Sequence, residues 1–257
     1  MNVALYRRAA GGGSYQGLWA MTERGAQQLT CRPRHLQIGP SGMHWDAAGN
    51  LHIAVDEWTA PLPQRLRGHI VLRPQVLPGR DFSLGDEGRH RWQPICPRGR
   101  IEVDFASPRL RWEGEAYLDS NQGERPLERD FSAWQWSRST LSGQRSHVFY
   151  EILAADGGQQ MLALGIDAQG RIEPLPLPPR QSLAPTGWGL PRSSRTGSGC
   201  ELMATLESGP FYSRSLLRDP QTGSIAVHES LSLRRFDQAW VQAMLPFRMP
   251  RRARNAA

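Results

Sequence analysis

Residues 108–121 read PRLRWEGEAYLDSN, and their side chains alternate between two kinds. Successive side chains of a β-strand point to opposite faces, so an alternation of period two predicts a half-buried strand. One face of this strand would carry the apolar or small residues Leu110, Trp112, Gly114, Ala116 and Leu118. The other face would carry Arg111, Glu113, Glu115, Tyr117 and Asp119. The stretch therefore predicts a β-sheet and places Tyr117 and Asp119 side by side.

The same alternation recurs in NLHIAVDEW (50–58), GHIVLRPQVL (68–77) and GRIEVDFA (99–106). Turn-forming residues separate later segments, as in ADGGQ (155–159), DAQG (167–170) and DPQTG (219–223). The segments that flank ADGGQ and DAQG resemble successive hairpins. The 26 glycines and 20 prolines also suit short strands joined by turns. We therefore predict an all-β, antiparallel chain.

One short helix is predicted near the C-terminus. RFDQAWVQAML (235–245) places Phe236, Trp240, Val241 and Met244 on one stripe, and Pro246 is expected to end the helix. Earlier in the chain, WQWSRS opens a fresh run of strands after the polar stretch SNQGERPLERD. We predict two units, residues 1–140 and 141–257.

The amino-acid composition limits the classes of partner that we expect for the chain. The net charge is +7 and all 31 basic residues are arginine. No basic helix and no aromatic-stacking signature accompanies this charge, so we expect no nucleic-acid partner. A basic surface also suits the anionic face of a membrane. No apolar run approaches the roughly 18 residues that a spanning helix requires, and we expect a cytoplasmic chain that is neither secreted nor integral.

Cofactor motifs are missing from the sequence. Three distant cysteines, with no CxxC pair, predict neither a disulfide framework nor a zinc site and suggest a reducing compartment. His35, His44 and His52 lack the regular spacing of metal ligands. No Walker sequence, GxSxG or strand-linked GxGxxG occurs. We expect no metal and no nucleotide cofactor.

Two pairs of residues have side chains suited to acid–base catalysis or ligand binding. In DEGRHRW (86–92), His90 and Trp92 would share a strand face, as Tyr117 and Asp119 do. One interpretation is a solvated strand face, and a second is that Asp119 caps a turn at DSNQG (119–123). The third is a pocket, because large aromatics alternate here with ionisable groups.

Nine stretches carry a resemblance to a known family over essentially the whole chain. They are NVALY, WAMTERG, IGPSGMHWD, LRG (66–68), GRHRWQPI, GEAYLDSNQGERPLERDFSAWQWSR, PFYSRS, HESLSL and LPFRMPR. The chain resembles the carotenoid 1,2-hydratase (hydroxyneurosporene synthase) family. The resemblance implies two lipocalin-like β-barrel or sandwich units, which agrees with the strand pattern.

The resemblance also implies a site, with a His-x-Trp and a Tyr-x-Asp pair that fall on His90, Trp92, Tyr117 and Asp119. Hydration of the terminal 1,2 double bond of an acyclic carotene, of the neurosporene or lycopene type, needs a proton, a tertiary carbocation and a captured water. Asp119 is the expected acid if burial keeps it protonated. Trp92 and Tyr117 would face the cation, and His90 would orient the water or accept its proton. No cofactor is implied.

Two alternatives remain open: a lipocalin-like carrier of an apolar ligand, and a related hydratase or cyclase for another terpenoid. The resemblance further implies peripheral contact with the inner or photosynthetic membrane and with other enzymes of carotenoid synthesis. Family members carry several tens of residues ahead of the position of Met1. We therefore expect a missing N-terminal segment and an unpaired strand edge in the first unit.

Overall fold

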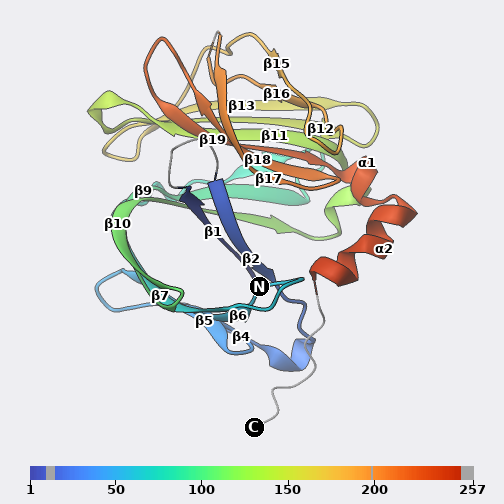
Figure 1. The fold of residues 1–257 in the computed structure, drawn as a ribbon. Helices are drawn as coiled ribbons and strands as arrows, with labels where there is room; N and C mark the ends of the chain where they lie inside the picture. Colours follow the sequence, from blue (N-terminus) through green and yellow to red (C-terminus); the bar gives the residue numbers. More distant parts are fainter. Residues whose placement is uncertain (10–14, 198, 250–257) are drawn as a thin grey trace.

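The computed structural model describes residues 1–9, 15–197 and 199–249. Within them the chain forms antiparallel β-sheets, followed by two short helices at the C-terminal end (Figure 1). The predicted all-β, antiparallel fold class with a helical segment near the C-terminus is confirmed.

An eight-stranded sheet holds the first half of the chain. Its strand order is β10-β9-β7-β6-β5-β4-β3, with β8 paired to β9. The strands are β3 (Leu29–Arg32), β4 (His35–Ile38), β5 (Ser41–Trp45), β6 (Leu51–Trp58), β7 (Arg65–Val76), β8 (Phe82–Leu84), β9 (His90–Ser107) and β10 (Arg109–Gly123). A hairpin of β1 (Asn2–Arg8) and β2 (Tyr15–Met21) packs on it through Val3, Leu5 and Leu18.

A seven-stranded sheet holds the second half, in the order β14-β13-β12-β11-β19-β18-β17. Its strands are β11 (Phe131–Thr140), β12 (Ser146–Ala154), β13 (Gln159–Ile166), β14 (Ile172–Pro174), β17 (Glu201–Ser208), β18 (Tyr212–Arg218) and β19 (Ile225–Ser232). Strands β15 (Gln181–Leu183) and β16 (Arg192–Ser194) pair separately. The predicted hairpins are present, since β12 pairs with β13 across ADGGQ and β13 with β14 across DAQG.

The main apolar core joins the two sheets. Leu84 and Trp92 come from β8 and β9, while Phe131, Trp136 and Tyr150 come from β11 and β12. Figure 1 shows the two sheets as separate layers, one drawn in blue to green and the other in yellow to orange. The faces that carry the large aromatic residues therefore meet at the centre of the molecule.

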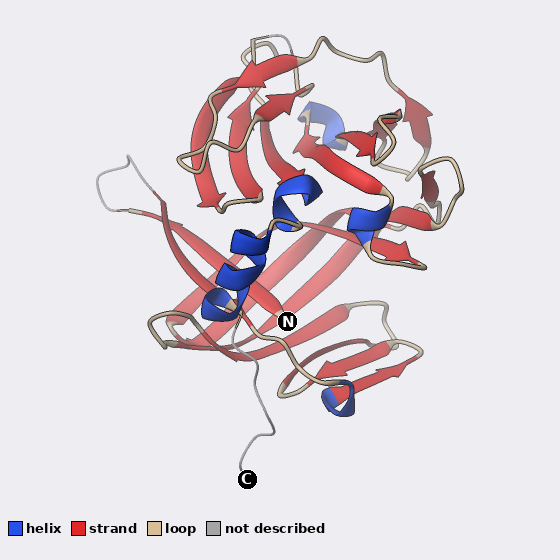
Figure 2. Cartoon of the chain, turned by 90° about the vertical axis from the view of Figure 1, so that its right-hand side faces the viewer, coloured by secondary structure: helices blue, strands red, loops and turns tan. Residues whose placement is uncertain are grey.

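The helical segment differs from the prediction in two ways. It divides into α1 (Leu233–Phe236) and α2 (Ala239–Arg248), and Pro246 lies inside α2 instead of ending it. A proline removes one backbone donor, and this helix continues only two residues past it. Val241 is fully buried, whereas Trp240 is 45% exposed and stacks on Trp188. Figure 2 shows both helices across the side where the two sheets meet.

The division into units 1–140 and 141–257 remains a proposal. The chain leaves the eight-stranded sheet at Gly123 and enters the seven-stranded sheet at Phe131. Strand β11, which the division assigns to the first unit, pairs with β12 and β19.

Candidate active site

Asp119 lies at the centre of the predicted group of residues. Trp92 Nε1 donates a hydrogen bond to Asp119 Oδ2 at 2.8 Å, and the Tyr117 hydroxyl donates to the same oxygen at 3.0 Å. Three of the four predicted site residues are thus in direct contact.

The pairing of β9 with β10 brings these three side chains together. Asn121 is the partner of Trp92, so Asp119 lies two residues from the position opposite the indole. The register shifts between Ala116 and Leu118 and again between Leu118 and Ser120. Such irregularities re-aim side chains, and here they turn Tyr117 and Asp119 toward Trp92. Because β10 runs on through Gly123, DSNQG forms no turn for Asp119 to cap.

The environment of Asp119 favours its neutral form. Burial raises the pKa of Asp119 above the ordinary carboxyl value, although the hydrogen bonds from Trp92 and Tyr117 act in the opposite direction. The negative charge of Glu229 adds to the upward shift. Since both donors bind Oδ2, the proton of the neutral acid would lie on Oδ1. This arrangement can present an O–H group to an apolar ligand.

Aromatic rings from the second sheet surround this acid. The Trp136 ring lies 5.4 Å from the Tyr117 ring, centroid to centroid, and the Tyr150 ring lies 5.7 Å from that of Trp92. Trp136 and Tyr150 are opposite each other on β11 and β12, and Trp134 contacts Tyr150 edge-on. Burial raises the pKa of Tyr117 and of Tyr150, and the charge of Asp119 adds to both shifts, so these phenols are neutral.

His90 lies apart from this contact network. Its Nε2 is 2.6 Å from Asp130 Oδ2, and its ring packs on Phe131. Asp130 also accepts hydrogen bonds from Arg89 and Arg125. The Nδ1 atom is buried without a hydrogen-bond partner in the described part of the chain. A Cβ atom at position 123 would lie 2.3 Å from Nδ1, so Gly123 is required for the ring to fit.

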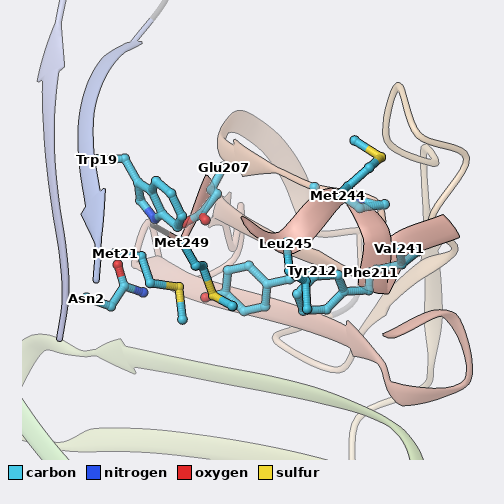
Figure 3. Close-up of a pocket in the computed structure, with 12 residues that line it drawn as sticks. Asn2, Trp19, Met21, Glu207, Phe211, Tyr212, Val241, Met244, Leu245 and Met249 are labelled. Carbon is cyan, nitrogen blue, oxygen red and sulfur yellow. The ribbon is translucent and has the colours of Figure 1, made fainter. Parts of the chain in front are cut away.

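An apolar cavity of about 310 Å³ opens on the side of the core where α2 lies. Trp19 and Met21 of the hairpin line one side and Leu245 of α2 the other, with Met249 and Tyr212 between them (Figure 3). Tyr212 also packs against the core cluster that contains Trp92 and Trp136. The cavity wall therefore adjoins the aromatic surroundings of Asp119.

Sequence reasoning did not identify the part of the site that the second sheet contributes. Trp136 and Tyr150 lie in alternating strands, but no local signal indicates which face meets the first sheet. Asp130 was likewise missed, because its partner His90 is 40 residues away. Among the described residues, no group of three or more histidine, cysteine or acidic side chains is arranged to hold a metal ion, and the three cysteines are free.

Comparison with solved structures finds the same fold elsewhere. A structure assigned as AttH from Nitrosomonas europaea aligns with a TM-score of 0.59 at 13% identity, covering 86% of this chain and 77% of that one. At this identity the likeness concerns the fold alone.

Curated relatives share far more sequence. Acyclic carotenoid 1,2-hydratases from Thiocapsa roseopersicina and Rubrivivax gelatinosus are 46% and 40% identical over 98% of this chain. The chain spans 61% and 62% of their lengths, respectively. The enzyme of the same name from Cereibacter sphaeroides is 36% identical, and the chain spans 88% of its length. The family model described as Carotenoid hydratase CrtC matches residues 1–257, and the chain therefore belongs to that carotenoid hydratase family.

Proposed function

We propose that this protein hydrates the terminal 1,2 double bond of an acyclic carotene to a tertiary alcohol. The observation that carries the proposal is Asp119, a partly buried carboxyl group with a raised pKa that accepts hydrogen bonds from two donors beside aromatic rings. The relatives are named for this reaction on acyclic carotenoids.

In the proposed mechanism Asp119 Oδ1–H protonates C2 of the alkene, and the positive charge develops at the dimethyl-substituted C1. A carboxylic acid that burial keeps neutral retains a proton for this step near neutral pH. Trp92 and Tyr117 stabilise the carboxylate that remains, because both donate to its Oδ2. Water then attacks C1 and loses a proton. The sequence predicts His90 for orienting this water, although its Nε2 lies 2.6 Å from Asp130 Oδ2.

Aromatic rings would stabilise the intermediate. A cation over an indole or phenol face gains roughly 0.5–2 kcal/mol, and more where water is excluded. The rings of Trp92, Tyr117, Trp136 and Tyr150 lie around the acid, so the cation would form next to several π faces.

The apolar cavity suits part of the long hydrocarbon chain. Its lining is dominated by methionine, leucine and aromatic side chains, and methionine adapts to irregular apolar shapes. We place the polyene beyond the reacting end in this cavity, with Tyr212 as the shared wall.

We also infer contact with a membrane surface. No helix in the described ranges is long and apolar enough to cross a bilayer. Phe247 of α2 is 78% exposed and Trp240 is 45% exposed, and the chain has a net charge of +7. Exposed aromatic side chains on a short helix and a basic surface both favour binding to anionic lipid.

The proposal is tested with lycopene or neurosporene supplied in vesicles. The expected product is a tertiary alcohol with the mass of one added water, detected by liquid chromatography and mass spectrometry. Asp119→Asn should lower turnover by at least about 10²-fold, because an amide keeps the shape but does not supply the proton.

The matched control is Glu115→Gln, an exposed carboxylate on the same strand, which should retain activity. A carrier would bind the pigment and release it unchanged. If Asp119→Asn kept full turnover while Glu115→Gln lost it, the proton would be assigned to the wrong carboxylate.

A further inference from the structure

The proposed hydration moves two protons, and Asp119 accounts for only one of them. Water that attacks the cation must give a proton to a base. The following inference rests on the proposed function and concerns this second group.

Glu229 faces the site from the second sheet. On β19 it is the direct partner of Trp136 on β11 and of Arg214 on β18. Directly opposed residues in an antiparallel pair point to the same face, with Cβ atoms about 4.5–5.5 Å apart. The Trp136 ring contacts Tyr117, whose hydroxyl holds Asp119. Glu229 therefore lies across the aromatic core from the acid.

The two oxygens of Glu229 have different surroundings. Arg214 Nε donates a hydrogen bond to Oε1 at 3.0 Å, and Arg214 Nη2 forms an ion pair with the same oxygen at 2.9 Å. Tyr212 also shares a hydrogen bond with this carboxylate. Arg214 and Tyr212 thus fix the group, and its remaining lone pairs can receive a proton from water. The side chain retains 24% of its exposure, so solvent reaches it. A carboxylate fixed by an arginine can thus hold water beside an otherwise apolar site.

Trp136 carries a hydrogen-bond donor that no described residue accepts from. Its side chain is nine-tenths buried, and Nε1 has no hydrogen-bond partner in the described part of the structure. A buried N–H group without a partner costs on the order of 1–3 kcal/mol. A water between the two opposed residues would accept from Trp136 Nε1 and donate to Glu229.

We propose that Glu229 is the base that binds the attacking water, with Trp136 Nε1 as its second contact. Asp119 loses a proton to C2, the water oxygen bonds to C1, and one water O–H bond breaks as Glu229 takes the proton. Exchange with solvent returns Glu229 to the carboxylate and Asp119 to the acid. The sum is one alkene plus one water giving one alcohol.

The negative charge of Glu229 also supports the assignment of Asp119 as the acid and Glu229 as the base. After burial, this charge is one of the causes that raise the pKa of Asp119. Two carboxyl groups with different environments commonly separate into an acid and a base. The sequence predicts that His90 orients the water or accepts its proton. The Nε2 atom of His90, however, lies 2.6 Å from Asp130 Oδ2.

The test is Glu229→Gln assayed in D₂O with the carotene in vesicles. Without the base, Asp119 delivers a deuteron to C2, and the cation loses the original hydrogen of C2 to the Asp119 carboxylate instead of capturing water. The recovered alkene then carries deuterium at C2, while alcohol formation falls by at least about 10²-fold. The ratio of alcohol to deuterated alkene is the measured quantity. Asp119→Asn should lose both products.

Glu102→Gln is the matched control, because Glu102 also pairs with a cross-strand arginine, Arg73, but on an exposed face. The ratio of alcohol to deuterated alkene in Glu102→Gln should equal that of the wild type. Trp136→Phe removes the indole donor and keeps an aromatic ring beside Tyr117. It should lower the ratio, and this result decides the matter if Glu229→Gln does not fold.

Wild-type ratios in both Glu229→Gln and Trp136→Phe would overturn the inference. The inference would also be overturned if the ratio of alcohol to deuterated alkene fell sharply in His90→Asn and stayed at the wild-type value in Glu229→Gln. A wild-type protein that yields neither alcohol nor deuterated alkene would instead refute the proposed hydration, and the inference with it.

Discussion

At the scale of single residues, opposing effects set the protonation of Asp119. Burial raises the pKa of this carboxyl group, and the hydrogen bonds from Trp92 and Tyr117 lower it. The burial effect is larger, so the net shift is upward. The hydrogen bonds from Trp92 and Tyr117 stabilise the carboxylate that remains after proton transfer. Proton transfer to carbon requires this stabilisation as well as a neutral acid.

Tyr117→Phe should move the alkaline limb of the pH profile of kcat/KM to higher pH. The hydroxyl stabilises the carboxylate form of Asp119, so its loss raises the pKa of Asp119 further. In the proposed mechanism the active form is the acid, and it would then persist to higher pH. Tyr150→Phe is the control, because Tyr150 contacts Trp92 through its ring. A limb that moves to lower pH would contradict the assignment of Asp119 as the acid.

At this scale the sequence indicates which side chains of the candidate site share a strand face, and it does not indicate their tertiary partners. The alternation in β10 correctly places Tyr117 with Asp119 on one face. It does not reveal the bulges that aim them at Trp92. Local pattern carries no information on partners such as Asp130 or Glu229, since these meet the site only through tertiary packing.

At the scale of elements, α2 and the hairpin β1–β2 form opposite walls of the apolar cavity (Figure 3). The local hairpins were predictable because their turns are encoded in neighbouring residues. The division of the helix at Asp237 and Gln238 was not, because period-3.6 spacing runs across the break.

Leu245→Trp should raise the KM for the carotene about tenfold, a loss of roughly 1.4 kcal/mol of binding, with a smaller effect on kcat. The indole would occupy the space between α2 and Met21 that we assign to the polyene. Steady-state kinetics in vesicles measures the change. Ala243→Trp places the same side chain on an exposed position of α2. Equal effects of the two substitutions would show that the helix, not the cavity, is responsible.

At the scale of the whole molecule, the site exists only where the two sheets meet. The acid and its two donors come from the eight-stranded sheet, and the aromatic wall and Glu229 come from the seven-stranded sheet. The all-β class follows from composition and alternation. Which faces oppose each other depends on contacts between distant strands, and a single sequence does not encode that in any local pattern.

Phe247→Glu should weaken co-sedimentation with anionic vesicles by about tenfold or more, because it replaces an exposed aromatic on α2 with a charge that the lipid repels. Binding of the wild type should fall as salt rises. Trp112→Glu is the control, since Trp112 is 43% exposed on β10, a strand of the eight-stranded sheet and not part of the helical segment. Equal losses in both variants would argue against α2 as the membrane contact.

The hydrogen bond between Trp92 and Asp119 has an optical consequence. An indole whose N–H group points at a carboxyl oxygen 2.8 Å away experiences a different electric field when that carboxyl group ionises. The near-ultraviolet absorption of the resting protein should therefore shift as Asp119 titrates, with no pigment present. The shift should be absent from Asp119→Asn, so that a pH series of difference spectra reads the charge of one buried acid directly.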